Sequence, residues 1–321
     1  MYKVVVTGGS GFIGTNLIDS LLSRGYDVLS LDISPPVNNE HLKIYQYCDI
    51  REYDSLYEKF IHYSPDIVVH LAARTDLDGK SLDDYSSNIL GVANVCQVVE
   101  NVTSIKKTLF ASSMLVCQAQ YVPQGVDDFS PNTLYGESKV EGEKIVRKSS
   151  DCLGDFVIFR PTSIWGPWFK VPYRNYFDMV LGGRFFDIDG GFCEKTYGYI
   201  TNAVNQIESL MMTDTDLRNK LIYLGDSKAV DISYWASLIA QNAHLPAPRR
   251  LPKWLFKIAA LSGDALKMIG ISFPLTSFRL SNMLTDNVVD CSVATSLNIY
   301  KEVALTEATK NTLQWISQNE K

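Results

Sequence analysis

A glycine-rich turn follows the first short apolar run of this chain and limits the folds open to it. Val4-Val5-Val6 indicates a buried strand, and Thr7-Gly8-Gly9-Ser10-Gly11-Phe12-Ile13-Gly14 comes directly after it, before a segment of helical character at 15–22. Glycines here let the backbone turn sharply, let a pyrophosphate approach the bare main chain and let the helix N-terminus face the anion. A purely structural turn is the alternative. We expect a dinucleotide site that includes Gly8, Gly11, Phe12, Ile13 and Gly14.

An aspartate at the end of the second strand supports this expectation. The run at 28–31 leads to Asp32, at the distance where an acidic side chain accepts hydrogen bonds from the adenosine ribose hydroxyls. A carboxylate there repels a 2′-phosphate, and no Arg or Lys follows at 33–36, so the sequence favours NAD over NADP. A strand-end turn or a helix cap is the structural alternative for Asp32. Asp49 and Ile50, after the third strand, are weaker candidates for the adenine end, since a plain turn also explains them.

Strand patterns alternate with helical patterns along the first half of the chain. Short apolar, β-branched runs lie at 4–6, 28–31, 67–69, 109–110 and 156–159, and helical patterns lie between them at 12–24, 52–62, 82–101 and 133–149. This alternation is typical of a parallel sheet with helices on both faces. We therefore predict an α/β fold with a doubly wound parallel sheet.

The pattern loosens after about Gly166 into aromatic- and glycine-rich stretches with proline-marked breaks. We predict a dinucleotide-binding domain at 1–165, to which 196–212 returns as strand and helix, and a smaller substrate-binding lobe at 166–195 and 213–321. The aromatic side chains at the start of this lobe either shape a sugar pocket or form core. They are Trp165, Trp168, Tyr173, Tyr176 and Phe177.

A tyrosine and a lysine lie four residues apart in the helical pattern at 133–149. In Tyr135-Gly136-Glu137-Ser138-Lys139 these two side chains share one helix face and reach a common ligand. Tyrosine, with a pKa of about 10, is a poor base, but a neighbouring ammonium and an oxidised nicotinamide lower that pKa. We predict that Tyr135 exchanges a proton with a sugar hydroxyl or carbonyl and that Lys139 holds the nicotinamide ribose. An exposed helix is the alternative for this spacing alone.

Two serines end the strand pattern that precedes this helix. Thr108-Leu109-Phe110-Ala111 leads to Ser112-Ser113, which places a hydroxyl at the carboxyl edge of a parallel sheet, where such folds bind their substrates. We predict that Ser113 polarises the substrate oxygen, with Ser112 as the second candidate. A strand-terminal turn is the structural alternative for both.

Charge and cysteine content exclude several classes of function. The net charge is −6 and the pI is about 5.3, with no long basic stretch to neutralise a phosphate backbone, so we expect no nucleic-acid partner. The six cysteines form no C-x-x-C pair, and with four histidines they provide no zinc spacing, so we expect no metal site and reduced, mostly buried thiols.

Two further segments bear on location. The first residues run straight into a strand pattern without a secretory leader, which predicts a cytoplasmic protein. The apolar stretch Trp254 to Ile271 is interrupted by Lys257, Asp264 and Lys267, which is too polar to span a bilayer. We expect an amphipathic helix packed on the protein and no membrane partner; a role at a membrane surface is the minor alternative.

Taken together and in order, these motifs resemble the extended short-chain dehydrogenase/reductase family, which includes NAD-dependent sugar-nucleotide epimerases and dehydratases. The resemblance covers roughly the first half of the chain. It rests on the glycine turn at 7–14, Asp32, Asp49-Ile50, His70-Leu71-Ala72-Ala73, the N-x-x-G-x-x-N arrangement from Asn88 to Asn94, Ser112-Ser113, Tyr135 to Lys139, and Arg160-Pro161 leading to Gly166-Pro167.

The resemblance implies a Rossmann sheet and assigns roles residue by residue. It implies that Ser113, Tyr135 and Lys139 are catalytic, that the glycines of the turn hold the pyrophosphate, and that Leu71, Ala72 and Ala73 line the cofactor. It also implies a C-terminal lobe that binds a nucleotide-sugar, a homodimer formed largely through helices, and a place in polysaccharide precursor synthesis.

Departures from the family pattern narrow the reaction. Sugar-nucleotide 4,6-dehydratases usually carry an Asp-Glu pair where this chain has Met114-Leu115, so dehydration is not expected. Combined epimerase-reductases use a cysteine at the position of Met114, which argues against added 3,5-epimerisation. The family's V-Y-G is Val116-Cys117-Gln118 here, and an asparagine that meets substrate phosphate is replaced by Ser163, which weakens assignment to the best-known galactose epimerases.

Arg279, within Ser277-Phe278-Arg279-Leu280, resembles the family's phosphate-binding arginine. A guanidinium suits this role because it offers the planar fork that such an anion needs. Arg174 and Lys170 are rival candidates for this role. We predict an enzyme that epimerises a nucleotide-sugar at one carbon, C4 by resemblance, without net redox change. The close alternative is an NAD(P)H-dependent keto-sugar reductase, and the distant one is a non-catalytic NAD-binding regulatory protein.

Overall fold

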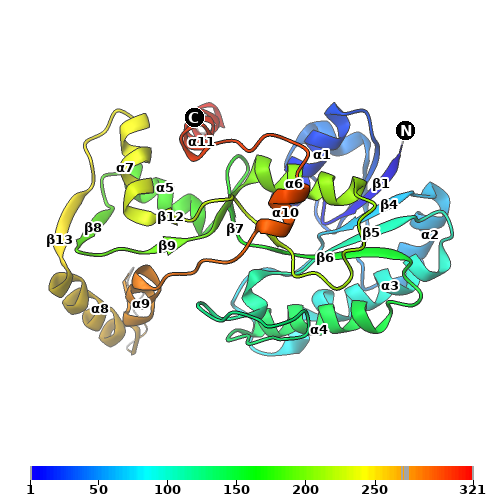
Figure 1. The fold of residues 1–321 in the computed structure, drawn as a ribbon, viewed down its shortest axis with the longest axis horizontal. Coiled ribbons are helices and arrows are strands. Elements are labelled where there is room, and N and C mark those ends of the chain that lie inside the picture. The colour runs from blue at the N-terminus through cyan, green and yellow to red at the C-terminus, as the bar shows by residue number, and fades with distance from the viewer. Residues whose placement is uncertain (1, 269, 271–274, 320–321) are drawn as a thin grey trace. The chain divides into compact units, whose positions relative to one another are not determined.

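The computed structural model describes residues 2–268, 270 and 275–319 (Figure 1). It consists of two compact units, each built from several segments of the chain. Unit 1 contains the residues up to Ile164, Ile200–Ser227 and Asp290–Glu302. Unit 2 contains Trp165–Tyr199, Lys228–Val289 and the residues from Val303 onward.

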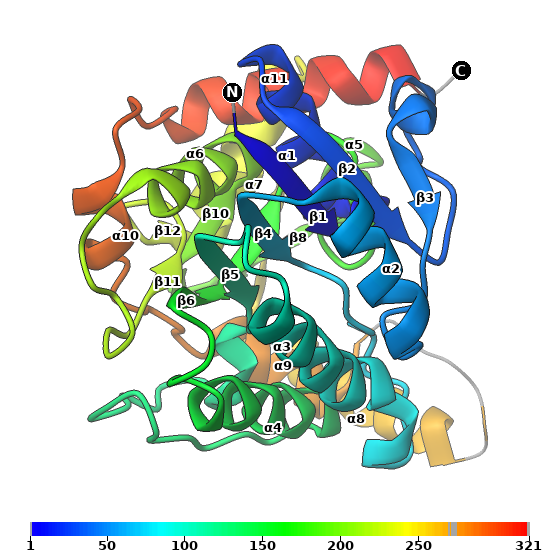
Figure 2. The ribbon, with the colours of Figure 1, turned by 90° about the vertical axis from the view of Figure 1, so that its right-hand side faces the viewer.

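A seven-stranded sheet with parallel pairing throughout forms the centre of unit 1 (Figure 2), as the sequence predicted. Its order is β11-β6-β5-β4-β1-β2-β3. Val5 lies opposite Leu29 on one side and Val68 on the other. The strands that follow β1 are therefore added first on one side of it (β2, β3) and then on the other (β4 onward). Ligands of such sheets bind at this switch point, outside the carboxyl ends of the strands. The strands are β1 (Lys3–Thr7), β2 (Asp27–Asp32), β3 (Tyr45–Tyr47), β4 (Ile67–His70), β5 (Lys107–Ala111), β6 (Asp155–Pro161) and β11 (Tyr223–Leu224).

The helices of unit 1 agree closely with the predicted helical patterns, except at 82–101. That segment is a 3-10 turn, a π turn and a helix in succession, and the first turn is fixed by a capping box between Ser81 and Asp84. The helices are α1 (Phe12–Ser23), α2 (Tyr53–Tyr63), α3 (Val92–Asn101), α4 (Leu134–Lys148), α6 (Ile200–Met212) and α10 (Ser292–Leu297), with short turns η1 (Asn39–Lys43), η2 (Leu82–Tyr85), η3 (Ser87–Gly91) and η4 (Met114–Val116).

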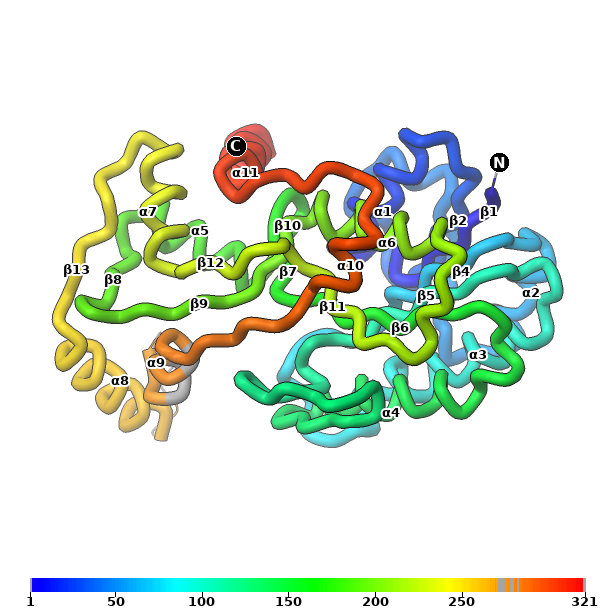
Figure 3. The backbone as a smooth tube through the Cα atoms, in the orientation of Figure 1, coloured from blue at the N-terminus to red at the C-terminus, as the bar shows by residue number. Residues whose placement is uncertain are grey.

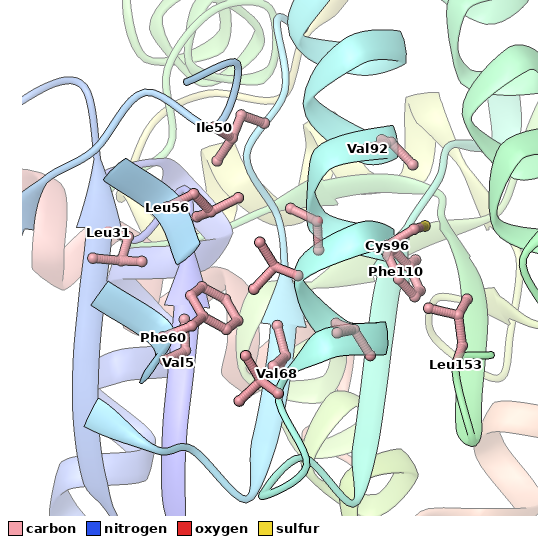
Figure 4. Packing of buried hydrophobic residues seen from close by; sticks show 14 of the residues in the cluster. Val5, Leu31, Ile50, Leu56, Phe60, Val68, Val92, Cys96, Phe110 and Leu153 are labelled. Atoms are coloured by element: carbon pink, nitrogen blue, oxygen red, sulfur yellow. The ribbon is translucent and has the colours of Figure 1, made fainter. Parts of the chain in front are cut away.

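Apolar side chains cover the sheet on both faces, which is why its strands are continuous apolar runs. Alternate strand residues such as Val5 and Val68 pack under α2 and α3 through Leu56, Phe60 and Val92 (Figure 4). Their neighbours in β1, such as Val4 and Val6, are equally buried and point to the opposite face, because successive strand side chains alternate. There α1 packs beside α6.

Unit 2 is built around an aromatic core. The ring centroids of Trp165 and Trp235 lie 4.6 Å apart, and Tyr176 and Phe177 pack on Trp235 at 5.0 and 5.6 Å. The aromatic cluster predicted as pocket or core is therefore core at these positions. The elements of this unit are α5 (Tyr173–Leu181), β8 (Phe186–Asp189), β9 (Glu194–Lys195), β10 (Tyr197–Tyr199), β12 (Val230–Asp231), α7 (Ile232–Asn242), β13 (Arg249–Pro252), α8 (Lys253–Met268), α9 (Ser277–Leu284) and α11 (Leu305–Asn319), and β7 (Ser163–Trp165) leads into it.

The boundaries of the units differ from the predicted ones at four places. Trp165 and the stretch at 196–199 lie in unit 2, whereas 213–227 and 290–302 lie in unit 1. The reason is that β11 joins the edge of the large sheet beside β6 and α10 packs on α6. Among the described residues, no helix has the length and apolar character needed to cross a bilayer.

Candidate dinucleotide and catalytic site

The glycine turn after β1 is closed against its neighbours without room for side chains. Gly8 has a φ of +74°, and a Cβ added there would lie 2.5 Å from the Ala72 nitrogen. A Cβ on Gly14 would lie 2.3 Å from the Gly8 carbonyl oxygen. The turn ends at Gly11, whose missing side chain leaves the first amides of α1 without a side-chain cap. The backbone therefore forms a bare cradle at a helix N-terminus, beside the Leu71–Ala73 segment, and this geometry suits a pyrophosphate.

Asp32 ends β2 and reaches this turn. Its Oδ2 accepts a hydrogen bond from the Ser10 amide at 3.0 Å, and its Oδ1 accepts one from the Ser34 amide at 2.9 Å. Asp32 thus has the turn-fixing role that the structural alternative proposed. A carboxylate has about four acceptor positions, so two bonds leave capacity for the ribose hydroxyls that the prediction requires.

The side chains of Asp49 and Ile50, which follow β3, lie in different environments. The Asp49 carboxylate pairs with the Arg51 guanidinium at 2.6 Å, and this hydrogen bonding lowers the pKa of Asp49. The Ile50 side chain is buried in the core of unit 1. Of the two candidates for the adenine end, only Asp49 therefore has its side chain outside that core cluster.

The asparagines of the N-x-x-G-x-x-N motif hold two of the loops at the sheet edge. Asn88 accepts the Arg74 amide at 2.8 Å and donates to the Arg74 carbonyl at 2.9 Å. Asn94 donates to the carbonyls of Ile50 and Arg51, each at 2.9 Å. Asn88 also donates to the Ser138 hydroxyl on α4 at 2.9 Å. The motif therefore fixes the segments after β3 and β4, a role that the sequence alone did not assign.

The structure brings Ser113, Tyr135 and Lys139 together: Ser113 caps the start of η4, and Tyr135 and Lys139 lie on α4. The Ser113 hydroxyl accepts the Leu115 amide at 3.1 Å and lies near enough to Tyr135 to favour its phenolate, an effect that acts to lower the pKa of that phenol. Lys139 lies one helical turn after Tyr135 and donates to the Ala111 carbonyl at 2.7 Å. All three side chains are buried. Helix α4 begins just before Tyr135 because the Thr133 hydroxyl caps the Gly136 amide at 3.0 Å.

Burial dominates the protonation of the tyrosine and the lysine. Loss of hydration raises the pKa of Tyr135 to about 12, although the Ser113 hydroxyl favours the phenolate. The same effect lowers the pKa of Lys139 to about 8, although the Glu143 charge opposes it. The predicted lowering of the Tyr135 pKa by the ammonium and an oxidised nicotinamide together is therefore not produced by Lys139 alone. Desolvation outweighs the ammonium, which is turned to the Ala111 carbonyl.

Ser112, the second candidate, faces a different environment. It lines a cavity of about 20 Å³ together with His70 and Lys139, enough for about one water molecule. Among the described residues, neither the Ser112 hydroxyl nor the His70 Nε2 has a hydrogen-bond partner. The His70 Nδ1 lies 2.7 Å from the Thr7 hydroxyl, and burial lowers the pKa of His70 to about 3, so the ring is neutral. Of the two serines, Ser113 is the one that contacts Tyr135.

Sequence reasoning missed two features that support the catalytic helix. The Tyr85 ring lies 6.2 Å from the Tyr135 ring, and its hydroxyl donates to the Asp76 carbonyl at 2.8 Å, which folds the loop after β4 over Tyr135. Glu143 on α4 pairs with Arg160 on β6, and both side chains are almost fully buried. Arg160 was noticed only as part of a motif. In the sequence, the available signal for the partner of Arg160 was the position of Glu143, four residues after Lys139 and therefore on the same face of the helix.

The substrate-binding candidates are less defined. Ser163 begins β7 and is half-buried. Arg279 lies in α9, and its side chain is not among those that the structure describes. Of its rivals, Arg174 pairs with Asp178 at 2.9 Å one turn along α5, and Lys170 is exposed.

Comparison with known proteins identifies relatives of the whole chain. A sequence profile of the NAD dependent epimerase/dehydratase family matches residues 4–180. The chain is 25% identical over 321 residues to an N-acetyl-alpha-D-glucosaminyl-diphospho-ditrans,octacis-undecaprenol 4-epimerase of Escherichia coli O157:H7, covering 98% of this chain and 95% of that one. It is 31% identical over 296 residues to a 3 beta-hydroxysteroid dehydrogenase/Delta 5→4-isomerase of Mycobacterium tuberculosis, covering 86% and 76%.

The fold has close counterparts among solved structures. The crystal structure of UDP-glucuronic acid 4-epimerase from Bacillus cereus, in complex with UDP-glucuronic acid and NAD, superposes with a TM-score of 0.75. The match covers 98% of this chain and 99% of the epimerase, at 20% sequence identity. At this identity the match supports the fold, whereas the roles of individual residues depend on the geometry described above.

Proposed function

This chain belongs to the NAD dependent epimerase/dehydratase family, and we propose that it inverts one carbon, C4, of a sugar carried on a nucleoside diphosphate. The observation that carries the proposal is that Ser113, Tyr135 and Lys139 are all buried close together, with Ser113 favouring the Tyr135 phenolate and Lys139 one turn along α4. This group lies at the carboxyl edge of the same sheet that presents the bare glycine cradle and Asp32. An acid–base group and a dinucleotide cradle on one sheet edge suit oxidation and reduction of an alcohol.

The residues present fit NAD. Gly8, Gly11 and Gly14 would hold the pyrophosphate with the first amides of α1, including those of Phe12 and Ile13, and Asp32 would accept from the adenosine ribose. Lys139 would hold the nicotinamide ribose, with Leu71–Ala73 alongside. When bound, the nicotinamide supplies a hydride acceptor and donor for the sugar carbon.

The protein's own share of the chemistry is proton transfer. Tyr135 takes the proton from the substrate hydroxyl through its phenol oxygen and returns it when the carbonyl is reduced. The Ser113 hydroxyl donates to the oxygen that gains charge. Because burial raises the pKa of Tyr135 to about 12, the phenolate needs nearby positive charge, which an oxidised nicotinamide would supply when bound. Burial of all three side chains excludes water from the proton path.

Relatives support a sugar as the substrate. The full-length relative from Escherichia coli and the solved enzyme from Bacillus cereus are both named as 4-epimerases of sugars on a diphosphate.

Met114 and Leu115 lie where dehydratases carry an acid and a base, and Met114 is buried, so water elimination has no proton carrier at these positions.

A second candidate function follows from the relative in Mycobacterium tuberculosis. A hydroxysteroid dehydrogenase also oxidises a secondary alcohol, and its 31% identity extends over 86% of this chain. The same three residues serve both reactions. The difference is that a dehydrogenase releases its ketone and reduced cofactor, whereas an epimerase returns the hydride and leaves the redox state unchanged.

Three further assignments belong to this proposal. Unit 1 holds the dinucleotide, and unit 2 contributes to binding the nucleotide-sugar. The family resemblance supports a homodimer. Six unpaired cysteines, five of them buried, suit a reducing compartment such as the cytoplasm.

The test is to incubate the purified protein with UDP-sugars, their 4-keto forms and a 3β-hydroxysteroid, following products by NMR and absorbance at the NADH band. Inverted sugar without net NADH supports the epimerase. Stoichiometric NADH consumption with a keto-sugar identifies a reductase instead, and NADH production with the steroid identifies a dehydrogenase. NAD binding without turnover of any compound would favour a regulatory protein.

A further inference from the structure

Helix α8 in unit 2 is apolar on two opposite faces. Its inner face buries Phe256, Ala260 and Gly263 at the spacing of one helical stripe, and Phe256 and Ala260 belong to one apolar cluster with Ile188 of β8 and Leu280 of α9. Figure 3 shows β13 leading into α8 with α9 beside it. This inner stripe accounts for the packing that the sequence predicted for the helix. It does not account for the apolar residues between these positions.

The outer face carries a second apolar stripe that is exposed. Trp254, Ile258, Leu261 and Met268 recur at the same helical spacing and are 59%, 55%, 65% and 88% exposed. At 3.6 residues per turn they lie on the side of the helix opposite Phe256. Large apolar side chains that share one exposed stripe indicate an interaction surface, in contrast to scattered single ones. We call these four residues the outer stripe of α8.

Basic residues lie near the outer stripe: Lys253 and Lys257 lie along one side of it, whereas Lys267 lies on the face that carries Phe256 and Arg250 pairs with Asp187 at 3.2 Å. The segment 249–268 contains Arg249, Arg250, Lys253, Lys257 and Lys267, and all five are exposed. Its one acidic residue, Asp264, accepts the Ser277 amide at 3.1 Å and is engaged in joining α8 to α9. The whole chain has a net charge of −6, so this segment is a basic region on an acidic protein. Its partner should therefore be both apolar and negatively charged.

An anionic bilayer surface meets both conditions. Helices with Trp, Leu and Ile on one face and Lys along its sides lie in the plane of the interface, with the apolar face at the headgroup–acyl boundary. Lysine stems extend along the apolar layer while their ammonium groups reach the lipid phosphates. A second copy of the chain is the less favourable partner, because a symmetric contact would bring Lys253 and Lys257 of both copies together.

We propose that the outer stripe of α8 docks on the surface of a membrane that contains anionic lipid, and that the protein works as a peripheral membrane protein. The inference goes beyond the catalytic proposal and does not depend on it, because the outer stripe is made of residues that neither the cofactor nor the proton path uses. It also replaces the sequence-based expectation that the protein has no membrane partner.

The test is flotation of the full chain with vesicles of phosphatidylcholine alone or with about a third phosphatidylglycerol. The key variant is the triple substitution Trp254→Gln, Ile258→Gln and Leu261→Gln. The matched control replaces three exposed apolar residues of other helices, Ile61→Gln, Met212→Gln and Tyr234→Gln. We expect the wild type to float with the anionic vesicles, the α8 variant to bind at least about tenfold less, and the control to bind as the wild type does.

Thermal unfolding checks that each variant is folded. The double variant Lys253→Glu/Lys257→Glu tests the same face without touching its apolar residues, and it should also lose binding to anionic vesicles. Added salt should weaken the binding of the wild type to these vesicles. Equal flotation of wild type and α8 variant overturns the proposal, as does a wild type that binds neither vesicle or both equally. A change of the α8 variant from dimer to monomer, with vesicle binding unchanged, would show that a second copy covers this face.

Discussion

Glu143 and Arg160 form a two-point ion pair inside unit 1, with Nε–Oε1 at 2.8 Å and Nη2–Oε2 at 2.9 Å. The pair joins α4, which carries Tyr135 and Lys139, to β6. Arg160 also donates to the Val126 carbonyl at 3.2 Å. The catalytic helix is therefore held to the sheet by charges that have no access to water.

Removal of the buried carboxylate should destabilise the protein strongly. Glu143→Gln leaves the Arg160 guanidinium buried without its counter-charge, which typically costs about 3–5 kcal/mol. The matched control is Glu141→Gln, because Glu141 pairs with Lys144 at the exposed surface of the same helix and such pairs contribute about 0–1 kcal/mol. Urea unfolding measures both. Equal losses in the two variants would contradict a structural role for the buried pair.

Replacement of the catalytic tyrosine should stop turnover without unfolding the protein. Tyr135→Phe removes the hydroxyl that exchanges the substrate proton, and loss of such a group lowers kcat by about 10²–10⁴-fold. Tyr121→Phe is the control, since Tyr121 hydrogen-bonds to Asp128 away from the proposed proton path. Initial rates are measured together with NAD affinity, which should be similar in both variants. A Tyr135→Phe protein with wild-type turnover would eliminate the proposed proton path.

The buried lysine should give stability a defined pH dependence. The pKa of Lys139 is about 8 when folded and about 10.4 in an unfolded chain. Between these values the unfolded state binds more protons, so stability rises with pH through this window. Relative to Lys139→Met, the free energy of unfolding of the wild type should increase by about 1–3 kcal/mol between pH 8 and 10.4. Urea midpoints at several pH values measure this difference, and a flat one would show that the lysine is not desolvated.

The carboxylate at the end of β2 should set the choice of cofactor. Asp32→Asn keeps one oxygen acceptor for the Ser10 or Ser34 amide but removes the charge that repels a 2′-phosphate. We expect NAD affinity to fall about tenfold and NADP affinity to rise, since one charge-assisted hydrogen bond contributes about 1.5–3 kcal/mol. Titration of both dinucleotides gives the ratio. An unchanged ratio would leave Asp32 only its turn-fixing role.

The glycine cradle should reject a single methyl group. A Cβ on Gly14 would lie 2.3 Å from the Gly8 carbonyl oxygen and 2.7 Å from the Gly9 Cα, so the backbone must move. Gly14→Ala should therefore weaken NAD binding by at least about tenfold, because the pyrophosphate contacts depend on this backbone. Gly125→Ala is the control, since no atom lies within 4 Å of its added Cβ. Equal NAD affinities in the two variants would place the dinucleotide elsewhere.

The elements of the first half could be predicted because their signals are local. Apolar runs and helical periods located most of the first six strands and α1, α2 and α4. Ser113 and Tyr135 lie close together because both belong to the connection from β5 to β6, at the carboxyl edge of the sheet. By contrast, β11 has two residues, Tyr223–Leu224, and its place beside β6 depends on a pairing across 63 positions. No local pattern specifies such an edge strand.

The pKa of Tyr135 shows a second limit of sequence reasoning. Spacing placed Lys139 beside it, and charge alone predicted a lowered pKa. Burial decided the outcome: the Tyr85 ring packs near the Tyr135 ring, and desolvation raises the pKa. Coverage by a segment some 50 positions earlier cannot be read from the Tyr-x-x-x-Lys spacing.

Helix α4 carries Tyr135, Lys139 and Glu143 at intervals of four residues, all buried on one side. Each added residue turns a helix by about 100°, so an insertion between Tyr135 and Glu143 would separate the proton-transfer group from the ion pair that anchors it. Homologous chains should therefore differ here by substitution at outward positions such as Glu141 and Lys144, and never by a change in length. Insertions should be confined to the segments on either side of the helix, where evolution can alter substrate preference without disturbing the chemistry.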